Sequence, residues 1–326
     1  MKVLITGVTS FLGAYTALQL LGEDHEVIGA VRPGSKNENV LEERGITQYP
    51  NYRTVYLDFD QLPDAECGEE HFAEVVEKSG EKDKVIDVWL HFAWDGIGSA
   101  GRENTDIQIQ NIENAKKAYI MAKLLGAKKF IFAGSQAEYG DGNHRAPRPI
   151  SPYGKAKRAF GRWATEQSLL GQIYEKDAMQ FIHMRIFSVY GDGDHKTSLV
   201  NTVLKGSIRK TPVVLGPCVQ RWNYLEVRDC ARAISILIDS DETRTDVYDI
   251  AGSDSRVLKK YVQAMNEIAG GGAELEFGIR SNNAEGGFNM SPEILKLQRL
   301  GFRQEISFED GIGELVEKKR LELEAG

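Results

Sequence analysis

The chain has 326 residues, of which 41% are hydrophobic and 27% are charged, and its formal net charge is -8 at pH 7. These values are typical of a globular protein of one or two domains and indicate neither a disordered chain nor a membrane protein. The acidic balance argues against a nucleic-acid surface, which needs clustered Lys and Arg, so an anionic substrate would need a locally basic pocket.

The cysteines, the histidines and the amino-terminal segment exclude several kinds of site. Cys67, Cys218 and Cys230 form no close pair, which fits a reducing compartment better than a disulfide framework or a zinc knuckle. None of the six histidines has metal-ligand spacing, so we expect no metal site. The apolar run that begins at Val3 ends by Gly7, which is too short for a signal peptide or a membrane span, and we expect a cytoplasmic protein.

Short β-branched runs alternate with helical patterns in the first part of the chain. The predicted strands are residues 2–6, 25–32, 53–59, 85–93, 129–135 and 180–188. Helical patterns lie between them, and those at 11–21 and 105–125 end at Gly22 and Gly126, where left-handed C-caps are expected. Such alternation predicts an α/β fold of the Rossmann type, a doubly wound parallel sheet with helices on both faces.

The rhythm changes after residue 188. The elements predicted there are a Gly/Asp-rich loop at 190–194, a helix at 199–209, a strand at 213–216, a helix at 229–238 and a strand at 246–251. We expect a smaller α/β carboxy-terminal lobe that closes over the strand ends and carries substrate specificity. The expected nucleotide-binding domain comprises residues 1–188 and about 223–255, and the substrate lobe comprises about 189–222 and 256–326.

The loop between the first strand and the first helix has the composition of a dinucleotide-binding turn. Gly7 permits the tight turn, Gly13 permits close packing of helix on sheet, and Ser10 stands where the pyrophosphate approaches, a position that is usually glycine. A helix amino terminus offers N–H groups and a positive dipole end to a phosphate. The residues expected to contact the dinucleotide here are Gly7, Thr9, Ser10, Phe11, Leu12 and Gly13.

The end of the second predicted strand bears on the identity of the cofactor. An acidic residue there would accept hydrogen bonds from the adenosine ribose, but this chain has Arg32, which can meet a 2′-phosphate. NADP is therefore favoured, and NAD stays open. The alternative is that Arg32 is only a solvated charge at a strand end.

A tyrosine and a lysine at the start of a later helix form the candidate catalytic pair. Ser151 can cap this helix, which places Tyr153 and Lys157 one turn apart on the same face. The ammonium and the helix end both favour the phenolate, whose usual pKa is about 10, so Tyr153 can act as acid or base. Ser135, at the end of the strand predicted at 129–135, can bind the reacting oxygen, and Lys157 can also reach the nicotinamide ribose.

Taken in this order, these motifs resemble the extended short-chain dehydrogenase/reductase family over nearly the whole chain. The resemblance is closest to its NAD-dependent epimerase/dehydratase branch of nucleotide-sugar enzymes, which includes UDP-galactose 4-epimerase and the NDP-4-keto-6-deoxysugar reductases. It implies further cofactor contacts at Asp58, Phe59, Phe92, Ala93, Trp94, Asn111, Tyr153, Lys157, Phe187 and Val189. It implies substrate contacts at Ser135, Gln136, Ser188 and Arg221. A homodimer formed through the helices at 105–125 and 152–174 is also implied.

Departures from the family pattern narrow the activity. Ser188 stands where sugar-processing members have asparagine, and Gln136 and Ala137 replace the acidic residues of members that dehydrate the sugar, so a 4,6-dehydratase is disfavoured. The main hypothesis is reduction of a 4-keto nucleotide sugar by NADPH, with Tyr153 protonating the oxygen. The alternatives are a nucleotide-sugar 4-epimerase that retains NAD, a reductase of a non-sugar ketone or aldehyde, and a non-catalytic, dinucleotide-binding redox sensor.

Overall fold

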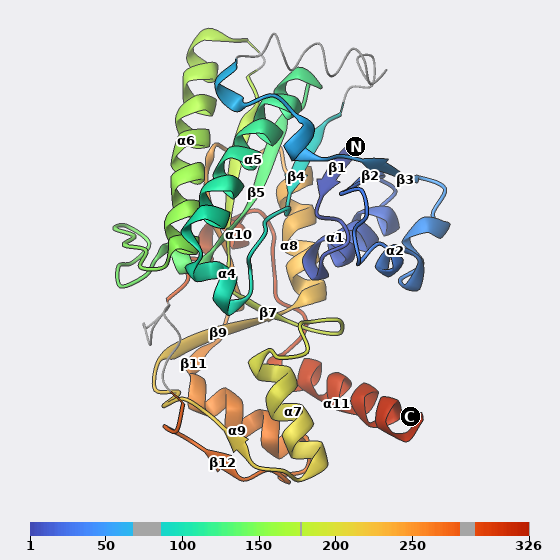
Figure 1. Cartoon of the computed structure of the whole chain (residues 1–326), viewed down its shortest axis with the longest axis vertical. Helices are drawn as coiled ribbons and strands as arrows, with labels where there is room; N and C mark the ends of the chain where they lie inside the picture. The colour runs from blue at the N-terminus through green and yellow to red at the C-terminus, as the bar shows by residue number, and fades with distance from the viewer. Residues whose placement is uncertain (68–85, 177, 281–290, 326) are drawn as a thin grey trace.

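The protein has a larger lobe built around a twisted sheet and a smaller, mainly helical lobe below it (Figure 1). The computed structural model describes residues 1–67, 86–176, 178–280 and 291–325. Among these residues, no helix combines the length and the apolar character that crossing a membrane requires.

Seven strands form the sheet of the larger lobe, and every neighbouring pair in it is parallel. Their order is β10-β6-β5-β4-β1-β2-β3. The bounds are β1 Lys2–Thr6, β2 Glu26–Val31, β3 Tyr52–Tyr56, β4 Val88–His91, β5 Lys129–Ser135, β6 Gln180–Ile186 and β10 Asp246–Ile250. The direction of winding reverses between β1 and β4, and ligands of such sheets bind beyond the carboxyl ends of the strands at that point. The predicted doubly wound α/β fold is thus confirmed.

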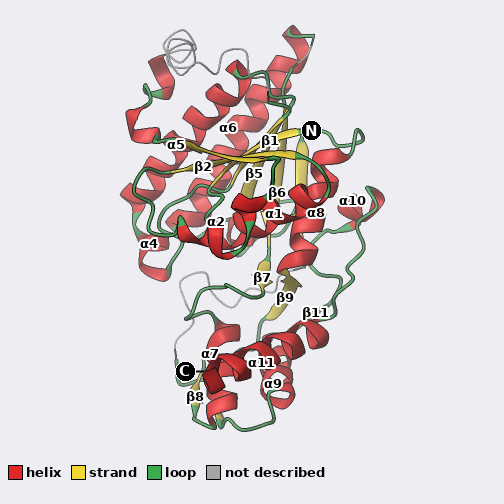
Figure 2. Cartoon of the chain, turned by 90° about the vertical axis from the view of Figure 1, so that its right-hand side faces the viewer, coloured by secondary structure: helices red, strands yellow, loops and turns green. Residues whose placement is uncertain are grey.

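Helices cover both faces of this sheet (Figure 2). Along β1, Val3 and Ile5 belong to the core that α1 (Phe11–Gly22) and α8 (Val227–Asp239) share with the sheet. Leu4, between them, belongs to the core on the other face, where α5 and α6 pack. Successive side chains of a strand point to opposite faces, so a strand buried on both sides is apolar throughout. The helices of the second face are α5 Thr105–Leu124 and α6 Pro152–Tyr174, with the short α4 Ser99–Glu103 beside them.

The smaller lobe has its own core, in which Tyr190, Tyr261 and Phe308 pack edge to face. Its helices are α7 Leu199–Arg209, α9 Leu258–Ile268 and α11 Phe308–Ala325. Its short strands are β7 Ser188–Tyr190, β8 Val213–Val214, β9 Arg221–Glu226, β11 Ser255–Val257 and β12 Leu275–Glu276. They form a three-stranded sheet, β11-β9-β7, and a two-stranded sheet, β12-β8. Two further short helices are α2 Asn39–Glu43 and α10 Leu295–Arg299.

After β7 to β9, the chain returns from the smaller lobe to the larger one and forms α8 and β10 there. Strand β10 pairs with β6, and α8 packs on α1. The buried ammonium of Lys129, at the start of β5, donates to the carbonyl oxygens of Ile238 at 2.7 Å and Ser240 at 2.8 Å, at the end of α8. A cation at a helix carboxyl terminus satisfies carbonyls that have no partner within the helix. The domain boundaries expected from the sequence stay a prediction.

Several element ends differ from the sequence prediction. Helix α1 continues through Gly22, and the left-handed residue after it is Asp24, with φ of 62°, so the predicted C-cap at Gly22 is wrong. The C-cap at Gly126 is confirmed by its φ of 74°. The strand predicted at 180–188 is divided into β6 and β7, with Phe187 between them. Residue 85, the predicted start of the fourth strand, lies outside the described residues.

Candidate active site

The turn between β1 and α1 requires both of its glycines. Gly7 has φ of +74°, and a Cβ atom there would lie 2.9 Å from the Ala93 nitrogen. A Cβ atom on Gly13 would lie 2.2 Å from the Gly7 oxygen. Ser10 caps α1 because its hydroxyl accepts a hydrogen bond of 3.1 Å from the Gly13 N–H. The first N–H groups of α1 therefore lie at the carboxyl end of β1, where a helix terminus can bind an anion.

Arg32, directly after β2, forms an ion pair of 2.8 Å with Asp95, which follows β4. Because β1 lies between β2 and β4 in the sheet, the pair spans the carboxyl end of β1. The backbone of Asp95 is held on both sides by buried Asn111 of α5, which accepts from the Asp95 N–H and donates to the Asp95 carbonyl, each at 2.9 Å. Asp95 was not predicted as a site residue from the sequence. Asn111, which was, binds the backbone of Asp95.

The predicted cofactor residues Asp58 and Phe59 follow β3. The Asp58 carboxylate accepts from the Asp60 N–H at 3.1 Å and so caps a short helical turn. The Phe59 ring lies edge to face with His91, with 5.9 Å between ring centres. His91 is buried, and its Nδ1 lies 2.8 Å from the Thr6 hydroxyl. Burial, with the nearby Lys157 charge, lowers the pKa of His91 to about 3, so the imidazole is neutral at pH 7.

The candidate catalytic pair lies in the first turns of α6. Ser151 caps this helix by accepting a 3.1 Å hydrogen bond from the Gly154 N–H. Lys157 is buried, and its ammonium lies 5.7 Å from the centre of the Tyr153 ring. The guanidinium carbon of Arg102, from α4, lies 4.5 Å from the centre of the same ring. The structure thus places the predicted pair together and adds Arg102 to its surroundings.

The Lys157 ammonium contacts a carbonyl and an indole. It donates to the Ala133 oxygen of β5 at 2.7 Å, and the centre of the Trp94 ring lies 3.7 Å away. Trp94 is fixed in turn, because its indole N–H donates to Gln108 of α5 at 2.8 Å. Burial lowers the pKa of Lys157 well below its usual value, with Arg102 acting in the same direction, while the Glu138 carboxylate opposes the shift.

Ser135 ends β5 and begins a short turn closed by Glu138. The Ser135 hydroxyl accepts from the Ala137 N–H at 3.2 Å, and the Ser135 N–H donates to the Glu138 carboxylate at 2.9 Å. Glu138 also lies 2.9 Å from His183 Nε2 and accepts from Arg185 Nε at 3.1 Å. Burial alone would raise the pKa of Glu138, but these partners outweigh burial and hold it below its usual value.

Glu138 was missed in the sequence analysis, although a signal for it exists. Ser135 and Glu138 stand three residues apart in the S-x-x-E pattern of a capping box. The pattern is typical of the amino termini of longer helices, whereas the turn here has only three residues, Gln136–Glu138. Here it fixes the backbone of the predicted catalytic serine.

The predicted substrate residues lie at two separate places. The Gln136 amide donates to the Ser188 hydroxyl at 3.1 Å, and its buried Oε1 has no partner among the described residues. Arg221 is exposed at the start of β9 and donates to the Ser255 oxygen at 2.6 Å. Because Ser188 pairs with Tyr224 of β9, Arg221 lies about 10 Å further along that strand.

Three predicted cofactor residues, Phe187 and Val189 after β6 and Phe92 after β4, pack against other side chains of the protein. Phe187 is buried, and its ring centre lies 6.0 Å from that of Tyr139. Val189 packs, partly buried, against the core of the larger lobe. Phe92 packs against the same core.

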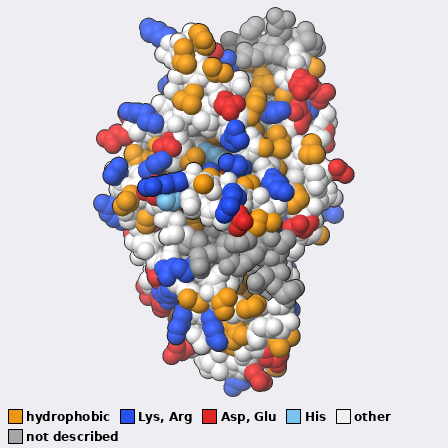
Figure 3. Space-filling view, turned by 90° about the vertical axis from the view of Figure 1, so that its left-hand side faces the viewer, with side chains coloured by type: hydrophobic (Ala, Val, Ile, Leu, Met, Phe, Trp, Pro, Cys, Tyr) orange, Lys and Arg blue, Asp and Glu red, His pale blue; other side chains and the backbone are white. Residues whose placement is uncertain are grey.

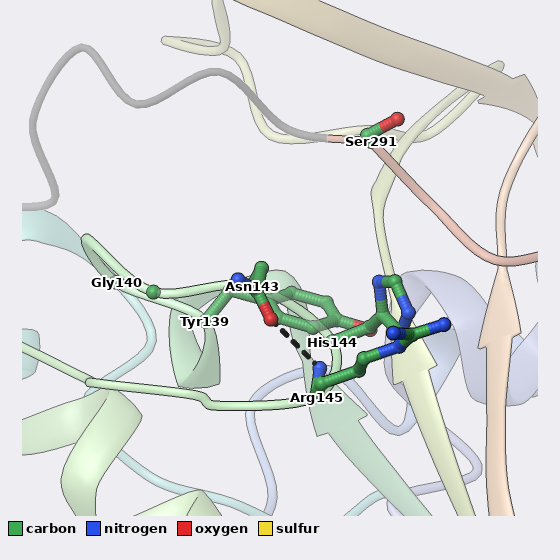
Figure 4. Close-up of a pocket in the computed structure, with 7 residues that line it drawn as sticks. Tyr139, Gly140, Asn143, His144, Arg145 and Ser291 are labelled. Atoms are coloured by element: carbon green, nitrogen blue, oxygen red, sulfur yellow. Dashed lines mark hydrogen bonds between the residues drawn. The ribbon is translucent and has the colours of Figure 1, made fainter.

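A pocket of about 380 Å³ lies beside the loop that follows the Ser135 turn (Figure 4). His144 and Arg145 line one side and Ser291 lies opposite them, across the pocket. Asn143 shapes the loop, because its side chain accepts from the Arg145 N–H at 2.9 Å. Lys and Arg side chains also gather on the middle of one face of the molecule, although the chain is acidic overall (Figure 3).

Residues 3–251 match the model of the family described as "NAD dependent epimerase/dehydratase family". An uncharacterized UDP-glucose epimerase of Bacillus subtilis (strain 168) is 22% identical to this chain, with 85% of each protein covered. The CDP-abequose synthase of Yersinia pseudotuberculosis is 26% identical over 43% of this chain and 47% of its own length.

Solved structures of similar proteins share the fold. The UDP-glucose 4-epimerase of Thermotoga maritima, in a structure with UDP-glucose, has a TM-score of 0.76 at 19% identity and covers 99% of this chain and 100% of its own. The UDP-glucuronic acid 4-epimerase of Bacillus cereus, in complex with UDP-glucuronic acid and NAD, has a TM-score of 0.74 at 18% identity and covers 98% of this chain and 100% of its own.

Proposed function

The chain belongs to the NAD dependent epimerase/dehydratase family, and from this premise we propose that it is a nucleotide-sugar 4-epimerase with NAD as its bound cofactor. The named 4-epimerases among its relatives and structural neighbours support this function over the reductase that the sequence favoured. The observation that carries the proposal is the Arg32–Asp95 ion pair. NADP was favoured because Arg32 could bind a 2′-phosphate, but Arg32 already has a carboxylate partner. This leaves NAD as the favoured cofactor, and NAD is the cofactor that an epimerase retains.

The dinucleotide would be held across the carboxyl ends of β1, β2 and β4. We assign its pyrophosphate to the turn from Gly7 to Gly13, whose close backbone approach leaves N–H groups as the donors. The adenine side is assigned to Asp58 and Phe59, and the nicotinamide side to Tyr153 and Lys157. When bound, NAD supplies a reversible hydride acceptor.

In the proposed reaction, the chain's own residues manage the proton on the sugar oxygen. Tyr153 removes the proton of the hydroxyl at C4 as the carbon is oxidised, and returns it after the ring has presented its other face. The Ser135 hydroxyl donates a hydrogen bond to the same oxygen. Lys157 favours the phenolate through its charge, 5.7 Å from the tyrosine ring centre.

The substrate is assigned to the region between the two lobes. Gln136 and Ser188, which contact each other, are proposed to bind the sugar. Gln136 Oε1, which has no hydrogen-bond partner within the described part of the chain, is an acceptor available to a sugar hydroxyl. Arg221, exposed on β9, is proposed to bind the diphosphate.

A homodimer through α5 and α6 remains part of the proposal. These helices pack against each other and leave apolar side chains uncovered, among them Ile109, Leu170 and Ile173, which are 59%, 49% and 70% exposed. A cytoplasmic location is proposed because the three cysteines are unpaired.

A second candidate is reduction of a 4-keto nucleotide sugar. The similarity to CDP-abequose synthase favours it, together with Arg32 at the end of β2. The two activities differ in stoichiometry. An epimerase leaves nicotinamide absorbance unchanged over many turnovers, whereas a reductase consumes one NADPH for each product.

The test is a panel of UDP- and CDP-sugars, with product followed by chromatography and nicotinamide by absorbance. We expect 4-epimer formation without added cofactor and release of NAD on denaturation. Tyr153→Phe should lower turnover by about 10²-fold or more, and Tyr174→Phe, at the exposed far end of the same helix, should not. If product appears only with stoichiometric oxidation of NADPH, the epimerase proposal is wrong and the reductase proposal takes its place.

A further inference from the structure

We propose that Asp95 is the residue that makes this site select NAD over NADP. Its carboxylate neutralises Arg32 and stands where the 2′-phosphate of NADP would need a free cation. This inference rests on the proposed dinucleotide site. It assigns cofactor choice to a residue after β4 instead of to an acid at the end of β2.

The position of the pair follows from the topology of the sheet. Arg32 continues directly from β2, where the adenosine ribose lies in folds of this kind. Asp95 reaches it from beyond β4, across the end of β1 and the turn at Gly7. A dinucleotide bound along the carboxyl ends of these strands therefore meets the pair at its ribose.

Asp95 is held more firmly than a typical surface acid. Buried Asn111 binds both its backbone N–H and its carbonyl, and Gln108, one helical turn earlier on α5, holds the preceding Trp94. The next residue, Gly96, has φ of +67°, and a Cβ atom there would lie 2.9 Å from an Ile107 methyl carbon. The direction of the chain through Asp95 is thus fixed by buried contacts.

The pair adds little to the stability of the fold. The side chains of Arg32 and Asp95 are 60% and 55% exposed, and solvent-exposed ion pairs contribute little to the free energy of unfolding. The effect of Asp95 on NADP binding is larger than its effect on stability, because the 2′-phosphate carries about two negative charges that the Asp95 carboxylate repels. The ribose hydroxyls of NAD are neutral, and they can donate hydrogen bonds to a carboxylate.

The experiment is a fluorescence titration of the full-length protein, stripped of nucleotide, with NADH and with NADPH. The wild type should bind NADH more tightly. Asp95→Asn removes the charge at constant shape and should raise the affinity for NADPH relative to NADH by about tenfold. The matched control is Glu26→Gln, which breaks the ion pair of 3.4 Å between Glu26 and Lys2 at the opposite end of β2 and should leave the ratio unchanged.

A ratio that Asp95→Asn changes by less than twofold overturns the inference, as does a wild type that prefers NADPH. Asp95→Ser, assayed in the same way, serves if the asparagine variant does not fold. The failure of the epimerase proposal has a different signature. A shifted ratio in a protein that converts no nucleotide sugar supports the role of Asp95 and rejects only the substrate assignment. A protein that binds neither dinucleotide rejects both.

Discussion

The Lys157 ammonium lies 3.7 Å from the centre of the Trp94 ring while donating to the Ala133 carbonyl at 2.7 Å. A π face and a neutral carbonyl compensate a buried charge less well than water does. Burying this lysine therefore costs stability, which is the cost expected if the proposed catalytic role of Lys157 requires it there.

Lys157→Met should stabilise the protein and abolish turnover. The pKa of Lys157 is lowered in the folded state, so at neutral pH the unfolded chain binds its proton more readily, which destabilises the fold. We expect the Tm at pH 7 to rise by about 2 °C or more. The gain should shrink as pH rises toward about 10.4, where free lysine loses its proton. Lys155→Met, exposed on the same helix, should change neither Tm nor turnover.

Glu138→Gln should destabilise the protein by about 3–5 kcal/mol, because the buried Arg185 guanidinium loses its charge partner in the interior. The pKa of Glu138 is lowered by folding, so its contribution is present above about pH 4.3 and is lost as pH falls through the lower folded pKa. Urea unfolding measures both effects. Glu166→Gln, exposed on α6, is the control, and equal stability of the two variants would contradict this account.

Stability should fall on acidification because of His91. Its pKa is about 3 in the fold, so below about pH 6.5 the unfolded chain binds a proton that the folded state does not. This single group lowers the free energy of unfolding by about 1.4 kcal/mol per pH unit in that window. The His91→Gln variant should be less stable at pH 7, but its free energy of unfolding should change less between pH 6 and pH 4. Urea unfolding measures this free energy at each pH. His144→Gln, in an exposed loop, should keep the wild-type slope.

Two alanine substitutions in α1 should have opposite effects. Gly13→Ala places a Cβ atom 2.2 Å from the Gly7 oxygen, so it should lower stability by about 1–3 kcal/mol and weaken NADH binding. Gly22→Ala adds its Cβ atom to open space and should stabilise the helix by about 0.5–1 kcal/mol without affecting binding. Thermal unfolding and NADH titration measure both. Equal NADH affinity in the two variants would contradict the assignment of the turn between β1 and α1 to the cofactor site.

Local patterns in the sequence were sufficient for the parallel sheet and for several elements. The strands at 2–6 and 129–135 and the helix at 199–209 have the predicted bounds, because apolar alternation and caps such as Ser198 are local signals. The place of Ser135 at the end of β5 and of Tyr153 in the first turn of α6 followed from the same signals.

Contacts between distant segments could not be predicted in this way. Asp95 lies 63 residues from Arg32, and no periodicity connects them. The contact between the Trp94 ring and the Lys157 ammonium likewise depends on how the segment after β4 lies against α6. Helix α1 extends one residue beyond its predicted end, and the left-handed residue is Asp24 and not Gly22, so the glycine alone did not determine where the helix ends.

The hydrogen bonds from Lys129 to the end of α8 have a consequence for biosynthesis. Strand β5 is translated about a hundred residues before the carbonyls that hold its lysine. Strand β6 likewise waits for its neighbour β10, which follows the first part of the smaller lobe in the sequence. In a nascent chain, β6 is therefore an open edge of the sheet until β10 has been synthesised. A fragment that stops at the end of β7 would expose that edge permanently and should aggregate.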